Sequence, residues 1–159
     1  MGSFHEWMPN SQSLLIRFVI RLRFMKPPRS LTITDREIGT GRTCVPGDVA
    51  ICECKCTRRK GAVVFESPSE SPYPIRVGGR DCYAGIEYGL LGMRLGGERT
   101  VIVPPNLTYD ERKTYPDLPE DGMLIYELTL VDLPEKWDPE MERRLAVPTN
   151  SNHNTQNGG

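Results

Sequence analysis

The strongest constraint on the fold is a series of short segments in which apolar and polar residues alternate. Successive side chains of a strand point to opposite faces, so this period of two predicts half-buried β-strands. Only Asp81–Leu91 has helical spacing, with Tyr83, Ile86 and Leu90 on one face and Gly92 just beyond, where a left-handed cap would lie. Several strands, one helix and further strands predict an α+β domain in which the helix covers one face of an antiparallel sheet. The strands are expected at 31–35, 49–56, 61–65, 73–77, 99–103 and 123–133.

The remaining segments divide the chain into an N-terminal extension (1–29), a compact domain (30–134) and a C-terminal part (135–159). In the extension, Leu14–Phe24 alternates strictly and predicts an amphipathic strand; its three arginines exclude a membrane span, and a basic segment lying on a membrane surface is the alternative. Residues 104–122 carry four prolines and are expected to form a loop. Residues 139–145 could form two helical turns, and the polar tail 148–159 is expected to be disordered.

The charge distribution argues against a nucleic-acid-binding surface. Residues 1–60 carry 11 Lys and Arg against 5 Asp and Glu, whereas residues 61–159 carry 9 against 16. A continuous nucleic-acid surface needs an excess of cations along one face. The two histidines, His5 and His153, lie near the chain ends, so the central domain lacks the commonest general base and the commonest metal ligand.

The five cysteines predict buried, reduced thiols. No secretory signal accompanies them, which favours a cytoplasmic protein. Cys52, Cys54 and Cys56 alternate, and in an extended strand they share one face and span about 13 Å, too far to converge on one zinc ion. We therefore expect core-facing cysteines and no metal or other cofactor; a thiol-dependent metal or redox protein is a much weaker alternative. The other two cysteines are Cys44 and Cys82.

Ordered motifs through the central domain closely resemble the FKBP-type peptidyl-prolyl cis-trans isomerases, over about residues 31–133. The most specific motif is the glycine-rich helix segment from Gly85 to Gly97. The resemblance implies a strongly curved antiparallel sheet wrapped around one short helix, in agreement with the element order. The motifs are Pro46-Gly47-Asp48, Gly61, Phe65-Glu66-Ser67, Val77-Gly78, Gly85-Ile86-Glu87-x-Gly89-Leu90-x-Gly92-Met93-x-x-Gly96-Gly97, Pro104-Pro105-x-x-x-Tyr109 and Leu124-x-Tyr126-x-Leu128-x-Leu130.

The same resemblance implies a pocket for a prolyl ring. Its walls would be aromatic, its floor would be Ile86, and the Tyr109 hydroxyl and the Tyr83 backbone amide would donate hydrogen bonds to the substrate. The implied catalytic residues are Phe65, Glu66, Tyr109 and Tyr126, and the implied substrate-binding residues are Cys54, Tyr73, Cys82, Tyr83, Ile86 and Leu118.

Four positions depart from the pattern of many active family members. Cys54 stands in place of Tyr, Glu66 in place of Asp, Ile86 in place of Trp and Asp110 in place of Gly. The expected function is therefore a prolyl isomerase of low or altered activity that acts on proline-containing polypeptides, assists protein folding and binds macrolide ligands weakly. A non-catalytic binding or chaperone module of the same fold is the alternative.

Overall fold

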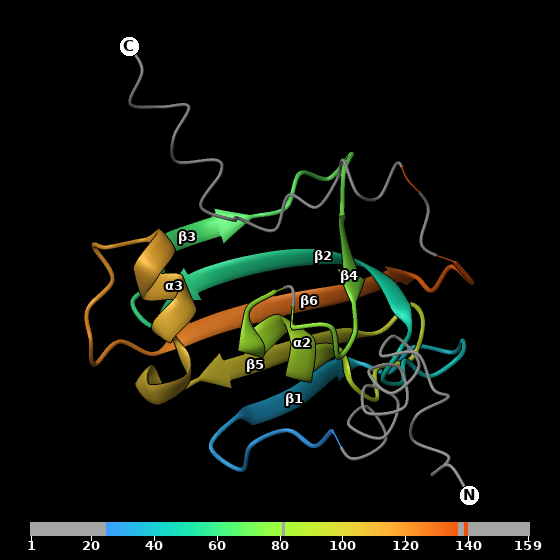
Figure 1. Ribbon diagram of the computed structural model, residues 1–159, viewed down its shortest axis with the longest axis horizontal. Helices are drawn as coiled ribbons and strands as arrows, with labels where there is room; N and C mark the ends of the chain where they lie inside the picture. The colour runs from blue at the N-terminus through green and yellow to red at the C-terminus, as the bar shows by residue number, and fades with distance from the viewer. Residues whose placement is uncertain (1–24, 81, 137–138, 140–159) are drawn as a thin grey trace, which may run out of the picture.

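Six antiparallel strands form one sheet in the order β1-β5-β6-β2-β3, with β4 paired to one end of β2 (Figure 1). The computed structural model describes residues 25–80, 82–136 and 139. The sheet and the main helix confirm the predicted α+β class. The elements are β1 (Thr32–Glu37), β2 (Val49–Arg58), β3 (Val63–Glu66), β4 (Tyr73–Arg76), α2 (Ala84–Leu90), β5 (Glu98–Val103), the 3-10 helix η2 (Pro105–Leu107), α3 (Tyr109–Thr114) and β6 (Leu124–Asp132).

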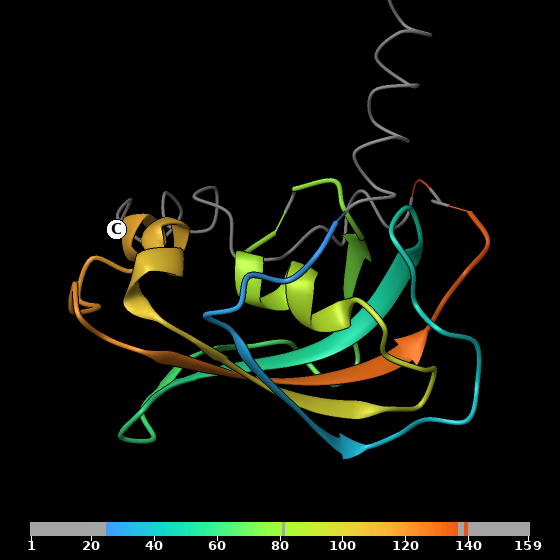
Figure 2. The same ribbon diagram turned by 90° about the horizontal axis from the view of Figure 1, so that it is seen from below.

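The sheet curves around α2, which lies on its concave face (Figure 2). Two glycines allow the helix to approach closely. A Cβ atom added to Gly85 would lie 2.7 Å from the Tyr126 ring, and one added to Gly89 would lie 2.6 Å from Leu128. The prediction that these glycines serve helix packing is confirmed, and it places α2 directly against β6.

The alternation of apolar residues fixes which face of each central strand is buried. In β2, Cys52, Cys54 and Cys56 are buried, and in β6 Leu124, Tyr126, Leu128 and Leu130 are buried in the same way. The two strands pair in register, with Cys56 opposite Tyr126 and Cys54 opposite Leu128. The prediction of core-facing cysteines is therefore confirmed.

A buried arginine holds the C-terminal end of α2. The Arg99 guanidinium donates hydrogen bonds to the carbonyl oxygens of Gly89 (2.9 Å) and Leu91 (2.7 Å) and to the Asp35 carboxylate (2.7 Å). The last carbonyls of a helix lack partners within it, and a cation there is favoured by the helix dipole. Gly92 follows with φ of +78°, as predicted for a left-handed cap.

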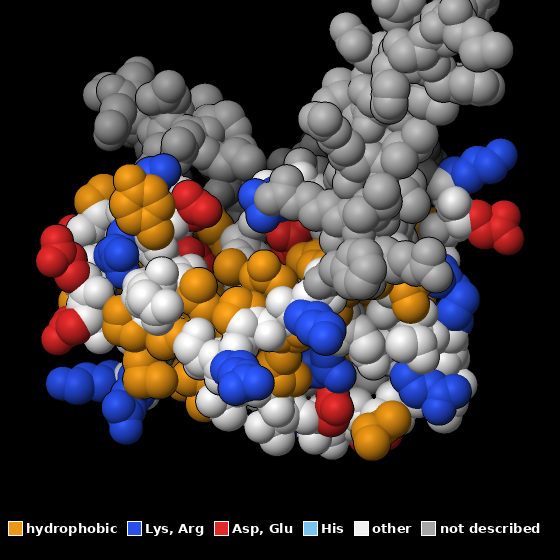
Figure 3. Space-filling model, turned by 60° about the horizontal axis from the view of Figure 1, so that its bottom comes forward, with side chains coloured by type: hydrophobic (Ala, Val, Ile, Leu, Met, Phe, Trp, Pro, Cys, Tyr) orange, Lys and Arg blue, Asp and Glu red, His pale blue; other side chains and the backbone are white. Residues whose placement is uncertain are grey.

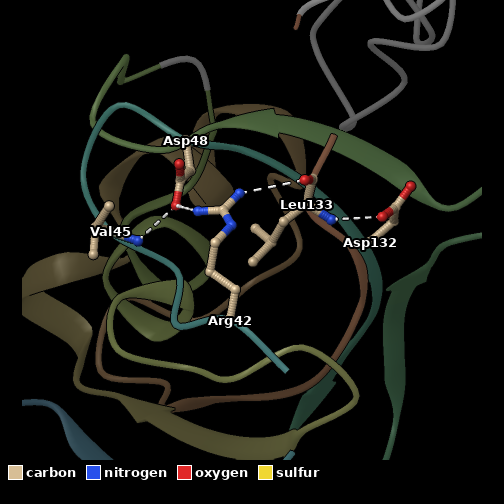
Figure 4. A network of polar contacts seen from close by, with 5 residues as sticks. All are labelled: Arg42, Val45, Asp48, Asp132 and Leu133. Carbon is tan, nitrogen blue, oxygen red and sulfur yellow. Dashed lines mark hydrogen bonds and ion pairs between the residues drawn. The ribbon is translucent and has the colours of Figure 1, made fainter. Parts of the chain in front are cut away.

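A second polar network ties the loop before β2 to the end of β6 (Figure 4). Asp48 accepts hydrogen bonds from Arg42 Nη1 (2.8 Å) and from the backbone amide of Val45 (2.9 Å). The second guanidinium nitrogen of Arg42 donates to the Leu133 carbonyl oxygen at 3.3 Å, and Asp132 accepts the Leu133 amide at 2.8 Å.

The expectation that residues 104–122 form a loop is wrong, because η2 and α3 lie within this segment. Pro105 begins η2, and a proline is well suited to a first-turn position. In α3, acidic Asp110 and Glu111 occupy the first turn and basic Arg112 and Lys113 the last, which suits the helix dipole. Six residues are too few to show a helical period in the sequence.

The expected N-terminal strand at 14–24, the helical turns at 139–145 and the polar tail fall outside the described residues, apart from Pro139. Within the described part, no helix is long and apolar enough to cross a membrane.

Candidate functional site

Aromatic side chains from four parts of the chain meet around Phe65 of β3. Its ring centroid lies 5.6 Å from that of Tyr83, 5.9 Å from that of Tyr126 and 5.8 Å from that of Tyr115. The Tyr126 ring meets Phe65 edge-on, whereas Tyr115 stacks on it with an interplanar angle of 13°. Such pairs stabilise one another beyond simple area burial. We call Phe65, Tyr83, Tyr115 and Tyr126 the aromatic cluster.

The elements explain why these side chains converge. Phe65 and Tyr126 both pair with Cys56 of β2, so they lie on the two strands that flank β2 and on the same face of the sheet. Tyr83 is the N-terminal cap residue of α2, and Tyr115 is the C-terminal cap residue of α3. The sheet therefore supplies two rings of the cluster, and the ends of the two helices supply the other two.

Other expected pocket residues also lie in the buried core. Ile86 of α2 is fully buried, and Tyr73 of β4, Leu118 and Cys54 are each less than a tenth exposed. Cys82 is half-buried and packs against the core. The Tyr73 hydroxyl donates to the Glu66 carbonyl oxygen at 3.5 Å.

Two expected catalytic residues do not join the aromatic cluster. Tyr109 is 61% exposed, and its ring lies under the Lys113 ammonium group, 4.2 Å from nitrogen to centroid. Glu66 is exposed at the end of β3, and its side chain lines a polar hollow with Glu53 and Lys55 on β2. The roles that the resemblance assigns to the Tyr109 hydroxyl and to Glu66 stay predictions.

The structure adds two residues of α3 to the site. Glu111 is fully buried, and its Oε1 accepts a hydrogen bond from the Tyr126 hydroxyl at 2.6 Å. Oε2 is buried without a hydrogen-bond partner among the described residues. Thr114 Oγ1 accepts a hydrogen bond from the Tyr83 hydroxyl at 3.0 Å. Sequence reasoning missed both because a short, charged, proline-flanked segment carries no apolar stripe.

Burial keeps the tyrosine hydroxyls of the site protonated near physiological pH. It raises the pKa of Tyr83 to about 12, and it raises the pKa of Tyr126 and of Glu111. The neighbouring thiols behave in the same way, since burial raises the pKa of Cys56 to about 12. Hydroxyl groups with such pKa values remain protonated and can donate hydrogen bonds.

Metal chemistry finds no support in the described part of the chain, where no three His, Cys, Asp or Glu side chains are grouped to hold an ion. The aromatic cluster lies on the concave side of the curved sheet beside the start of α2, and apolar and aromatic side chains of this kind are the usual lining of ligand pockets.

Comparison with known proteins identifies the family. A family model described as FKBP-type peptidyl-prolyl cis-trans isomerase matches residues 40–131, more than half of the chain. The chain belongs to the FKBP-type peptidyl-prolyl cis-trans isomerase family.

Individual relatives agree with this assignment. FK506-binding protein 4 of Chaetomium thermophilum is 34% identical over 109 residues, which are 69% of this chain and 22% of the relative. FK506-binding protein 3 of Candida albicans is 32% identical over 62% of this chain and 23% of the relative. The chain thus spans less than a quarter of the length of these two relatives.

Solved structures share the fold. The crystal structure of AtFKBP13 superposes with a TM-score of 0.57 at 23% identity, covering 69% of this chain and 97% of that one. FkpA from Escherichia coli superposes with a TM-score of 0.55 at 21% identity, covering 77% of this chain and 58% of that one.

Proposed function

We propose that this chain is a peptidyl-prolyl cis-trans isomerase that acts on X-Pro bonds of polypeptides at the aromatic cluster. The observation that carries the proposal is the convergence of Phe65, Tyr83 and Tyr126 in the same buried core as Ile86, within the family fold. Tyr73 and Leu118 complete the proposed wall for the prolyl ring.

The chemistry suits a site without an ionised acid–base pair. Rotation about an X-Pro bond breaks amide resonance, crosses a barrier of about 18–20 kcal/mol and moves no proton. A dry apolar pocket favours the less polar twisted amide, and hydrogen-bond donors placed for that form bind it better than either planar isomer. A preference of about 5 kcal/mol would accelerate the rotation several thousand-fold.

Donors for the twisted amide would come from the start of α2 and from the exposed Tyr109. Tyr83 is the cap residue of α2, and the first amides of a helix have no acceptor within it. The Tyr109 hydroxyl can donate a hydrogen bond to the substrate only if this exposed ring turns towards the cluster when substrate binds.

We propose low activity and weak binding of macrolides such as the FK506 after which the relatives are named. Ile86 in place of a tryptophan floor and Cys54 in place of a tyrosine wall both remove ring area that would contact a ligand. A protease-coupled assay with peptides of several X residues tests the proposal. We expect the wild type to accelerate cis–trans isomerisation of the peptides and Phe65→Leu to accelerate it less. If the wild type accelerates isomerisation for no X residue, the proposal is contradicted.

A non-catalytic polypeptide-binding module that assists folding is the second candidate. The near-complete burial of the Phe65, Tyr83 and Tyr126 rings favours it, because a closed pocket turns over substrate slowly. It predicts that an unfolded, proline-rich polypeptide binds and that Tyr109→Phe leaves this binding unchanged. A large loss of affinity in this variant would contradict the second candidate.

The surface and the thiols support two further parts of the proposal. On the face drawn in Figure 3, cationic and acidic side chains are interspersed around a hydrophobic area, so this face does not provide a continuous cationic track for nucleic acid. The free, largely buried cysteines support a cytoplasmic location, which cell fractionation can test.

A further inference from the structure

Helix α3 turns one of its faces towards the aromatic cluster. Glu111, Thr114 and Tyr115 lie at positions i, i+3 and i+4, which are neighbours on one side of a helix. Each contacts a different ring of the cluster. The contacts are the Tyr126 hydroxyl to Glu111 Oε1 at 2.6 Å, the Tyr83 hydroxyl to Thr114 Oγ1 at 3.0 Å, and the Tyr115 ring stacked on Phe65 with centroids 5.8 Å apart.

The opposite side of α3 faces solvent. Asp110 and Lys113 are exposed and form an ion pair at 3.6 Å, and Arg112 is half-buried. The helix is therefore amphipathic in its contacts although its sequence is almost entirely polar, and the side that it buries lies against the proposed substrate site.

These contacts leave little room for a substrate. Phe65, Tyr83 and Tyr126 are each less than a tenth exposed, and the Tyr115 ring lies beside Phe65 in a nearly parallel, offset arrangement. Two open hollows of about 420 and 440 Å³ are lined by none of the four rings of the cluster; Leu118 lines the first, and Tyr109, Arg112 and Lys113 of α3 line the second. A prolyl ring placed against this side of Phe65 would meet the Tyr115 ring.

The segment that carries Tyr115 is suited to move. A helix of six residues is marginal without tertiary contacts, so docking on the cluster is what stabilises α3. Beyond it, a turn closed by the hydrogen bond from the Leu118 amide to the Tyr115 carbonyl oxygen (3.0 Å) connects the helix to the exposed residues before β6. The segment is also held by Arg112 Nη1, which donates to the Pro105 carbonyl oxygen at 2.8 Å, and by Arg58 Nη2, which donates to the Asp117 carbonyl oxygen at 3.0 Å. Displacement of Tyr115 therefore requires a local movement at the end of α3 and not the release of the whole segment.

We infer that Tyr115, held by α3, is an internal occupant of the proline-binding site and that substrate binds only after this ring is displaced. The inference rests on the proposed function, since it concerns the same pocket. Only molecules in which Tyr115 is displaced can bind, so the apparent affinity is the intrinsic affinity multiplied by the fraction of such molecules. A substitution that destabilises the docked position of Tyr115 therefore strengthens binding.

The test measures the binding of an X-Pro tetrapeptide to the full chain by NMR, following the methyl signals of Ile86 and Leu118. Tyr115→Ala removes the occupying ring and is expected to lower Kd about tenfold. Asp117→Ala changes an exposed side chain of the same turn and is the control, with no change expected. Thr114→Val removes the acceptor of the Tyr83 hydroxyl at similar volume and is expected to lower Kd by about two- to threefold.

The outcomes separate the inference from the proposed function. If Tyr115→Ala is folded and binds no more tightly than the wild type, the inference is overturned, even where the wild type catalyses isomerisation. If Tyr115→Ala binds more tightly while no variant catalyses isomerisation, the inference stands and the proposed catalysis falls. If Tyr115→Ala does not fold, Thr114→Val decides: unchanged binding in that variant overturns the inference.

Discussion

At the scale of single residues, the unusual feature is a carboxyl group buried among aromatic rings. Glu111 accepts the Tyr126 hydroxyl through one oxygen, while the other oxygen is buried without a partner among the described residues. Burial and the adjacent Asp110 disfavour ionisation of this group, whereas the hydrogen bond from Tyr126 and the nearby Arg112 favour it. Burial is the largest influence and raises the pKa of Glu111 above 4.5.

This raised pKa predicts a pH-dependent effect of Glu111→Gln on stability. The folded state holds the proton of Glu111 more tightly than the unfolded state. The contribution of Glu111 to the free energy of unfolding is therefore lost as pH rises from 4.5 through the raised pKa. Glutamine mimics the protonated group and avoids this loss. Urea unfolding should show Glu111→Gln gaining stability over the wild type at pH 8, with the difference shrinking at pH 4.

An exposed carboxyl on the same segment provides the control for this prediction. Glu120→Gln should change stability little at either pH, because Glu120 is exposed. The assignment of a raised pKa would be contradicted if the effect of Glu111→Gln on stability is independent of pH, or if the wild type is more stable than Glu111→Gln at pH 8.

At the scale of elements, Arg99 connects β5 to the end of α2 and to β1. Replacing it by methionine leaves two helix carbonyls and Asp35 without their donor, and hydrogen bonds to charged groups contribute about 1.5–3 kcal/mol each. We expect Arg99→Met to lower the free energy of unfolding by about 2–4 kcal/mol, measured by urea denaturation.

The matched control is Arg36→Met on β1. Arg36 pairs with Glu127 at 3.0 Å, but both side chains are about half exposed. Exposed ion pairs contribute about 0–1 kcal/mol, so this variant should lose less than about 1 kcal/mol. Equal losses in the two variants would contradict the role given to Arg99.

Strand β2 makes a prediction about thiol reactivity. Burial raises the pKa of Cys52 and Cys56 to about 12 and that of Cys54 as well, and the thiolate is the reactive form. Iodoacetamide labelling of the native chain at pH 8, followed by peptide mass spectrometry, should therefore modify the half-buried Cys82 before any cysteine of β2. Labelling of Cys54 at the rate of the denatured chain would contradict the buried β2 face.

The elements also show what the sequence could and could not reveal. The β2 and β6 strands were predictable because alternation follows from one buried face, and α2 was predictable because three apolar residues share one side. Helix α3 was not, because Glu111 and Thr114 are polar residues that become buried only by hydrogen bonding to Tyr126 and Tyr83. The resemblance implies a role for Tyr109 in the pocket, which stays a prediction, and the contact of Tyr115 with Phe65 became visible only in the structure.

At the scale of the whole molecule, a curved sheet holds one helix on its concave face, and the aromatic cluster forms where the sheet, the start of α2 and the end of α3 meet (Figures 1 and 2). The two solved structures share this fold with TM-scores of 0.57 and 0.55. The fold therefore brings the four rings of the cluster together, and in our proposal the residues after Tyr109 control access to them.

Catalysed cis–trans exchange of an X-Pro peptide, measured by NMR exchange spectroscopy, tests the central claim most directly. Uncatalysed exchange takes tens to hundreds of seconds at 25 °C, so even weak catalysis is measurable. The account predicts the fastest exchange with Tyr115→Ala, slower exchange with the wild type, and the slowest with Phe65→Leu. Uncatalysed exchange in the presence of both the wild type and Tyr115→Ala, or undiminished catalysis by Phe65→Leu, would contradict it.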